Sequence, residues 1–120
     1  MNSQEANQLI NTLYKAVDNK DLNYLDKILS DDVNFRIGNY ETISDKATAL
    51  AANEQFFGSI NAMNHTIDKV WQVENDVLCN GVVDYIRLDG SEHSAYFSTV
   101  LTIDNGKITD YFVYADISQL

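Results

Sequence analysis

The sequence predicts an α+β domain in which helices come first and an antiparallel meander follows, with the helices on one face of the sheet. Apolar residues recur at helical 3,4-spacing in the first part of the chain, and from about residue 63 they alternate as in strands. Three turn-like segments divide the alternating part into four runs. A length of 120 residues suits a single domain, residues 1–120.

The first part predicts two helices. Residues 3–18 carry one apolar face, and Asn2 with Glu5 forms a capping pair before it. Asp21 is expected to cap a short second helix, which residues 30–32 end.

A short strand and a third helix are expected next. Residues 33–37 alternate as a strand and stop at Gly38. Ser44 is expected to cap a helix that runs to about Phe57, with Gly58 as its stop. The buried stripe of this helix is expected to hold Ala47, Leu50 and Ala51.

The second part predicts four strands, over residues 63–73, 76–88, 92–103 and 107–116. The segments between them have hairpin composition: Glu74-Asn75-Asp76, Asp89-Gly90-Ser91 and Asp104-Asn105-Gly106. Each strand is therefore expected to pair with the next one in antiparallel fashion.

Composition excludes several classes of partner. The net charge of −10 disfavours nucleic acid and anionic membranes. No apolar run approaches the roughly 18 residues of a membrane span, and the first residues do not resemble a signal peptide, so a cytoplasmic location is expected. Cys79 is the single cysteine and lies in an apolar run, which indicates a buried thiol rather than a nucleophile.

Several short motifs together resemble the nuclear transport factor 2-like superfamily, specifically its SnoaL-like branch. They are Tyr14…Lys20-Asp21-Leu22…Leu29-Ser30-Asp31-Asp32-Val33-Asn34-Phe35, then His65-Thr66-Ile67 with Trp71, and Gly106-Lys107-Ile108. The resemblance covers nearly the whole chain. It implies a cone, in which a curved antiparallel sheet wrapped by three N-terminal helices encloses an apolar cavity. Members include steroid isomerases, polyketide cyclases, dehydratases and epoxide hydrolases, and others only bind or assemble, so the fold does not settle the function.

The resemblance also implies which side chains face the cavity. The expected lining is Leu13, Phe35, Ile37, Val82, Ile86, Phe97, Thr99, Leu101, Tyr111 and Val113, with Asp84 among them. The opposite parity is apolar and aromatic, and in this family such a face commonly forms a homodimer. The residues expected in the dimer are Val83, Tyr85, Tyr96, Val100, Phe112 and Tyr114. The alternative is a solvent-exposed face with stray aromatic residues.

Most of the family's catalytic positions lack the required side chain. The proton-shuttling acid of the steroid isomerases falls at Ile37, their carboxylic hydrogen-bond donor at Thr99, and their tyrosine at Leu13, next to Tyr14. The acid that cyclases and epoxide hydrolases share falls at Val113. These known reactions are therefore disfavoured.

Three residues remain as catalytic candidates. Asp84 matches the aspartate of the hydrolase-like pair, and burial in a cavity would make it an acid or a base. His65 matches the histidine that takes part in acid–base dehydration in the scytalone dehydratase-like branch. Tyr14 lies on the core face of the first helix, where its hydroxyl would orient or polarise a substrate. For each residue the alternative is a hydrogen-bonded structural role.

Two functional hypotheses follow. One is a cofactor-free isomerase, cyclase or dehydratase that acts on a small hydrophobic molecule. The other is a non-catalytic module that binds such a ligand or dimerises. The spacing of His65, Asp84 and His93 does not suggest a metal site, and no phosphate-binding glycine loop is present, so neither metal nor cofactor is expected.

Overall fold

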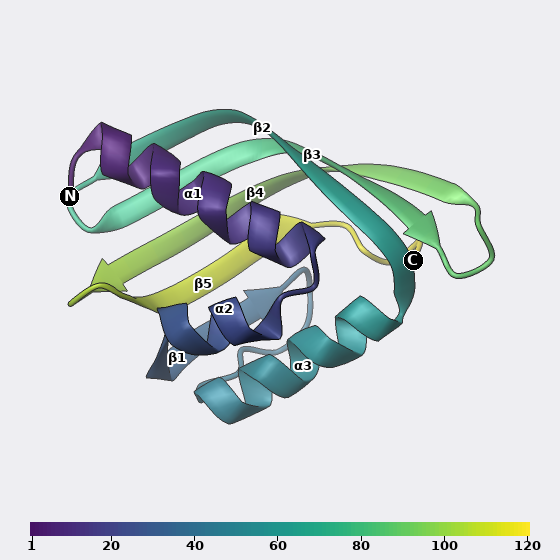
Figure 1. The fold of residues 1–120 in the computed structure, drawn as a ribbon, viewed down its shortest axis with the longest axis horizontal. Coiled ribbons are helices and arrows are strands. Elements are labelled where there is room, and N and C mark those ends of the chain that lie inside the picture. Colours follow the sequence, from purple (N-terminus) through teal and green to yellow (C-terminus); the bar gives the residue numbers. More distant parts are fainter.

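The computed structural model describes all residues from Met1 to Leu120. The helices are α1 (Ser3–Asp18), α2 (Leu22–Ile28) and α3 (Lys46–Gly58), and the strands are β1 (Leu29–Ile37), β2 (Ile60–Val73), β3 (Asp76–Arg87), β4 (Glu92–Asp104) and β5 (Lys107–Ala115). In Figure 1, α1 crosses one face of a long curved sheet, and α3 packs beside β1. The predicted α+β class is confirmed.

The first two helices begin at the predicted caps. The side chain of Asn2 accepts the backbone N–H of Glu5 at 2.8 Å, and the Glu5 carboxylate accepts the backbone N–H of Asn2 at 3.2 Å. Asp21 accepts the backbone N–H of Tyr24 at 3.1 Å. These bonds satisfy donors that the first helical turn leaves free.

The third helix differs from the prediction at its start and in its buried face. Asp45, not Ser44, is the cap, and it accepts the backbone N–H of Thr48 at 2.7 Å. The residues that the helix buries are Ala49, Asn53 and Phe57, whereas Ala47 and Ala51 are exposed. The segment is so rich in alanine that its apolar pattern does not identify one face, and the true stripe includes a polar Asn53 whose amide donates to the Ala49 carbonyl at 2.8 Å.

The five strands form one sheet in the order β1-β5-β4-β3-β2. The three predicted antiparallel hairpins of the second part are present. The first strand instead pairs in parallel with the last, and Ile37 lies opposite Val113. Alternation identifies a strand but not its neighbour, which explains why the parallel pair was not predicted.

The inner face of β3 was predicted one residue out of register. Val83 and Tyr85 are buried, and Asp84 between them is exposed. Pairing fixes this orientation, because Val83 lies opposite Ala95 in a row that leads to the buried Phe97 on β4. Since side chains alternate between faces, a shift of one residue turns the whole strand over. The inward orientation expected of Val82, Asp84 and Ile86 is therefore wrong.

One apolar core fills the space between α1 and the sheet. It is made by Ile10 and Leu13 of α1, by Val83 of β3 and by Leu101 of β4, all fully buried. None of the helices is long and apolar enough to cross a membrane.

Candidate functional site

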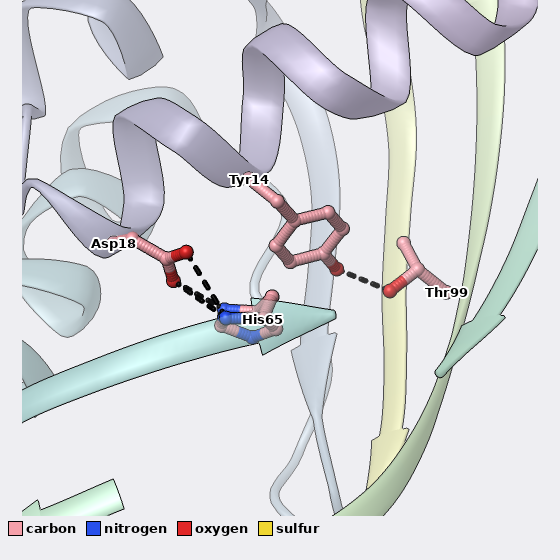
Figure 2. A network of polar contacts seen from close by, with 4 residues as sticks. All are labelled: Tyr14, Asp18, His65 and Thr99. Carbon is pink, nitrogen blue, oxygen red and sulfur yellow. Dashed lines mark hydrogen bonds and ion pairs between the residues drawn. The ribbon is translucent and has the colours of Figure 1, made fainter. Parts of the chain in front are cut away.

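A polar cluster lies where α1 crosses the sheet. Figure 2 shows Tyr14 and Asp18 directed from α1 toward His65 on β2 and Thr99 on β4. Tyr14 and Asp18 are one helical turn apart, so both project from the covered face of α1. The fold thereby brings together residues from the first helix and from two strands far along the chain.

The centre of this cluster is a hydrogen-bonded pair of Asp18 and His65. The Nδ1 atom of His65 lies 2.6 Å from a carboxylate oxygen of Asp18, and the two oxygens also accept the His65 backbone N–H at 3.0 and 3.2 Å. Only 7% of the His65 side chain and 19% of the Asp18 side chain are exposed. The pair also covers the free edge of β2, which is the last strand of the sheet.

This geometry determines which ring nitrogen of His65 carries the proton. An ionised carboxylate only accepts hydrogen bonds, so Nδ1 carries the proton that the pair shares. In the neutral ring Nε2 then holds the free lone pair. No protein group bonds Nε2. The side-chain polar atom that is both fully buried and without a partner is Ser30 Oγ. Nε2 of His65 is therefore not fully buried and keeps contact with solvent.

Tyr14 holds the imidazole from the other side. Its ring centroid lies 4.4 Å from that of His65, which also packs edge-on against Phe97 at 5.0 Å. The Tyr14 hydroxyl points away from His65 and is hydrogen-bonded to the Thr99 hydroxyl in the core (Figure 2). Burial, and then the neighbouring Tyr111, raise the pKa of Tyr14 well above its ordinary value, so this hydroxyl stays protonated.

Tyr14 also corrects one expectation from the resemblance. The tyrosine of the steroid isomerase-like sites was expected at Leu13 and the acid partner at Thr99. Leu13 is a fully buried core residue, whereas Tyr14 contacts Thr99. Tyr14, and not Leu13, is therefore the residue of α1 that places a side-chain hydroxyl beside Thr99.

A polar hollow opens beside the Asp18–His65 pair. It has a volume of about 340 Å³ and is lined by Asn11, Tyr14, Lys15, Asp18, Asn19, Asn64, His65 and Ile67. Its walls are one edge of α1 and the neighbouring edge of β2. Because His65 lies in this lining, the hollow gives small molecules a route to its ring.

The charge of Asp18 also affects the pKa of a buried tyrosine in the core. Burial, and then the negative charge of Asp18, raise the pKa of Tyr85 to about 12. Burial raises the pKa of the Cys79 thiol to about 11, so this cysteine is a protonated core residue rather than a nucleophile.

Asp84 lies outside this cluster. Its carboxylate is exposed on the outer face and accepts the Ser94 hydroxyl at 2.5 Å from the neighbouring strand. The inner face, where a cavity was expected to desolvate it, is on the other side of the sheet and is filled by the packed core. Of the three catalytic candidates, the structure brings together His65 and Tyr14 and leaves Asp84 apart.

The residues expected to line a cavity fall into three groups. Leu13, Phe97, Thr99, Leu101 and Tyr111 are buried in the packed core, and Val113 is half-buried beside Ile37. Val82 and Ile86 are on the outer face. Phe35 and Ile37 line a mainly apolar hollow of about 420 Å³. Its other lining residues are Arg36, Tyr40, Glu41, Ile43, Ala52, Gln55, Phe56, Ser59 and Ile117.

The outer face of the sheet carries part of the predicted dimer surface. Tyr96 is 85% exposed and Tyr114 49% exposed, and Val100 and Phe112 are half-buried there. Val83 and Tyr85 are buried on the inner face, so their expected place on the outer, dimer-forming face is wrong. The Arg36 guanidinium lies 4.7 Å from the centroid of Phe112. The homodimer itself stays a prediction.

The side chains that usually hold metal ions are scattered. No group of three or more His, Cys, Asp and Glu side chains is placed to bind one.

Asp18 is the site residue that the sequence reasoning missed. In the sequence, Asp18 is the last residue of the first predicted helix, and no motif assigns it a role. A usable signal was present, since Asp18 follows Tyr14 by four residues and so shares its helix face. The sequence did not indicate that this face meets His65, because 47 residues separate the partners.

Comparisons with known proteins agree with this fold. The solved structures that match include a candidate SnoaL-like polyketide cyclase from Jannaschia sp. CCS1, with a TM-score of 0.84, 9% identity, and coverage of 97% of this chain and 88% of that one. An epoxide hydrolase of the LEH-like type from M. tuberculosis matches with a TM-score of 0.81, 19% identity, and coverage of 96% and 85%. A candidate polyketide cyclase from Xanthomonas campestris matches with a TM-score of 0.84, 18% identity, and coverage of 99% and 96%. Identities this low show a shared fold alone and do not establish a shared reaction.

Sequence comparison identifies the family. No curated protein matches the chain. The family model of the SnoaL-like domain matches residues 10–111, which span α1 to β5 and include Tyr14, Asp18 and His65. The resemblance inferred from the sequence motifs is confirmed, and the chain belongs to the SnoaL-like domain family.

Proposed function

We propose that this protein catalyses a cofactor-free proton transfer on a small molecule, with His65 as the base and Asp18 as its orienting partner. The observation that carries the proposal is the 2.6 Å contact between Nδ1 of His65 and Asp18, with Nε2 left free. An imidazole held in one tautomer by a carboxylate is a recurrent arrangement for general base catalysis. The similar structures described as polyketide cyclases and as an epoxide hydrolase show that the fold can carry chemistry on small molecules.

The chemistry needs only the residues of the cluster. Nε2 of His65 accepts a proton from an acidic C–H or O–H bond of the substrate, and the bonding electron pair stays on the substrate. The resulting imidazolium is stabilised by the adjacent Asp18 carboxylate. The same nitrogen can return the proton at another atom, which gives an isomerisation, or to a leaving hydroxyl, which gives a dehydration.

Tyr14 has a positioning role in this proposal. Its ring packs against the imidazole, and its hydroxyl is hydrogen-bonded to Thr99 in the core and does not face the hollow. We therefore assign to Tyr14 the support of the His65 ring in place of the substrate contact expected from the sequence.

Hydrogen exchange on carbon acids tests the proposal without knowledge of the substrate. A panel of small ketones, aldehydes and keto acids is incubated with the protein in D₂O, and the loss of α-proton signals is followed by NMR. We expect catalysed exchange for at least one compound. The rate should fall by about a hundredfold in His65→Gln, because general base catalysis typically contributes 10²–10⁴.

Two further variants give the controls. Asp18→Asn should slow exchange because the amide no longer fixes the tautomer, whereas Asp84→Asn on the outer face should leave the rate unchanged. Exchange that persists in His65→Gln, or that depends on Asp84, contradicts the assignment.

A second candidate function is the binding of a small apolar molecule without chemistry. The hollow of about 420 Å³ between β1, α3 and the C-terminal tail favours this binding function. Phe35, Ile43 and Phe56 form its apolar walls, and the space between them is open. This volume is within the range of small-ligand sites, about 300–1,000 Å³.

Filling the hollow separates the two candidates. Ala52 lines it and is half-buried, whereas its neighbour Ala51 is exposed and does not line it. Ala52→Trp should abolish retention of an apolar molecule, detected by mass spectrometry of what co-purifies, and Ala51→Trp should not. Equal retention by both variants counts against a ligand in this hollow.

A further inference from the structure

We propose that the hollow beside His65 binds a small carboxylic acid, with the Lys15 ammonium group holding the carboxylate. The inference rests on the proposed function, since it names the substrate class of the same site. It differs from the small hydrophobic ligand that the family resemblance suggests.

Polar side chains line both walls of this hollow. Asn11, Lys15 and Asn19 follow one another at intervals of four residues, so they form one stripe along α1 that ends at its C-cap, Asn19. Asn64 and His65 line the opposite wall on β2. The volume of about 340 Å³ is at the small end of the range for ligand sites, about 300–1,000 Å³.

Lys15 differs from most other lysines in having no protein partner. Lys20, Lys46 and Lys107 donate to backbone carbonyl oxygens, and Lys69 lies over the ring of Trp71. The Lys15 ammonium group has no acceptor among the hydrogen bonds or ion pairs of the molecule, and it is the cation in the lining of the hollow.

The acidic group at the hollow is already engaged in hydrogen bonds. The Asp18 carboxylate accepts hydrogen bonds from both the ring and the backbone of His65. Lys15 forms no ion pair with it, so its ammonium group is available to an anion, and the side chains of Asn11 and Asn64 offer amide donors with no bond in the protein. In a protein of net charge −10, an anion needs such a local cation to bind.

A singly charged carboxylate fits this set of donors better than a phosphate. One ammonium group balances one negative charge, and amide N–H groups complete the coordination of the oxygens. The hollow also follows the C-terminal half of α1, where the helix dipole disfavours any anion and opposes a doubly charged one more strongly than a carboxylate.

NMR titration with matched probes tests the inference. Butanoate, its neutral analogue butanamide and inorganic phosphate are added separately to isotope-labelled protein. The resonances followed are the His65 ring and the side-chain amides of Asn11 and Asn64. We expect butanoate to shift them saturably, and the dissociation constants of butanamide and phosphate to be at least about tenfold higher, the scale of one charge-assisted hydrogen bond.

Lys27 provides the matched control. Lys15 and Lys27 both lie in the last turn of a helix, and the side chain of Lys27 also lacks a protein acceptor, but Lys27 does not line this hollow. Lys15→Gln should weaken butanoate binding about tenfold, whereas Lys27→Gln should leave it unchanged. Equal binding of butanamide, stronger binding of phosphate, no effect of Lys15→Gln, or no saturable shift with butanoate overturns the inference.

Failure of this inference can be told apart from failure of the proposed function. Proton exchange on neutral ketones that persists without carboxylate binding leaves His65 as the base and removes only the substrate class. Carboxylate binding that is intact in a protein without exchange activity supports the Lys15 site and removes the reaction.

Discussion

Asp18 and Asp84 lie on opposite sides of the same sheet and show how position decides what a carboxylate can do. Asp18 is mostly covered, binds a histidine and adjoins a hollow, whereas Asp84 is exposed and binds a serine on the next strand. By sequence, Asp84 has the more apolar neighbours, Val83 and Tyr85. Those neighbours face the other way and do not desolvate it. Apolar neighbours along a strand therefore say little about the burial of the residue between them.

The largest expected difference between the two faces is in stability. Phe97 is 3% exposed on the inner face of β4, and the preceding Tyr96 is 85% exposed on the outer face. Phe97→Ala should lower the free energy of unfolding by about 3–5 kcal/mol, because it leaves a cavity in the core. Tyr96→Ala should change it by about 0.5 kcal/mol or less. Urea unfolding of the two variants measures both values.

The same pair of variants sharpens the prediction of a homodimer. If the outer face joins two copies, the stability of the wild-type protein depends on protein concentration, and Tyr96→Ala shifts the molecular mass seen by light scattering toward the monomer and weakens that dependence. Wild-type protein that is monomeric at micromolar concentration contradicts the dimer.

Alkaline pH should act on the inner face through Cys79. The pKa of its thiol is raised from 9.0 to about 11 in the folded state. Below pH 9 both states keep the proton; as the pH rises toward 11, only the unfolded state releases it, and up to about 2–3 kcal/mol of stability is lost. Cys79→Ala removes this contribution, so its destabilising effect in urea unfolding should shrink between pH 8 and pH 11. An effect that is the same at both pH values contradicts the raised pKa.

The smallest expected difference is in the coupling of the two hydrogen-bonded pairs. A double-mutant cycle with Asp18→Asn and His65→Gln should give a coupling energy of about 1–2 kcal/mol, because the bond is largely shielded from water. The cycle with Asp84→Asn and Ser94→Ala should give about 0.5 kcal/mol or less, since both residues are exposed. Similar coupling energies would remove the distinction between the two faces.

The elements of the fold were largely predictable, because helix periodicity, caps and hairpin turns are local signals. Residues 3–18 and the turns after residues 73, 87 and 104 appear close to where the pattern placed them. The family resemblance was also sound. Its motifs report the fold and not a reaction, so they pointed to His65 but also to Asp84, which lies outside the cluster, and they gave no role to Asp18.

The errors have physical causes that lie beyond local pattern. On β3, residues 77, 79, 81, 83 and 85 are all apolar or glycine, and this alternation indicates the inner face correctly. The family resemblance instead implied that Val82, Asp84 and Ile86 face inward, which is the opposite parity. The cavity expected around Thr99 is closed by Tyr14 and Phe97, and only packing in three dimensions reveals that. The contact of Asp18 with His65 depends on how α1 docks on β2, which no single segment encodes.

The tautomer of His65 is the most direct test of whether Asp18 orients this ring to act as a base. Long-range ¹H–¹⁵N NMR of protein labelled in histidine, at about pH 8 where imidazoles are mostly neutral, distinguishes protonation at Nδ1 from protonation at Nε2. We expect His65 to carry its proton on Nδ1 and Asp18→Asn to remove this preference, while His93 is unaffected. A wild-type His65 protonated on Nε2 would contradict its assignment as the base, because that nitrogen could then not accept a proton from a substrate.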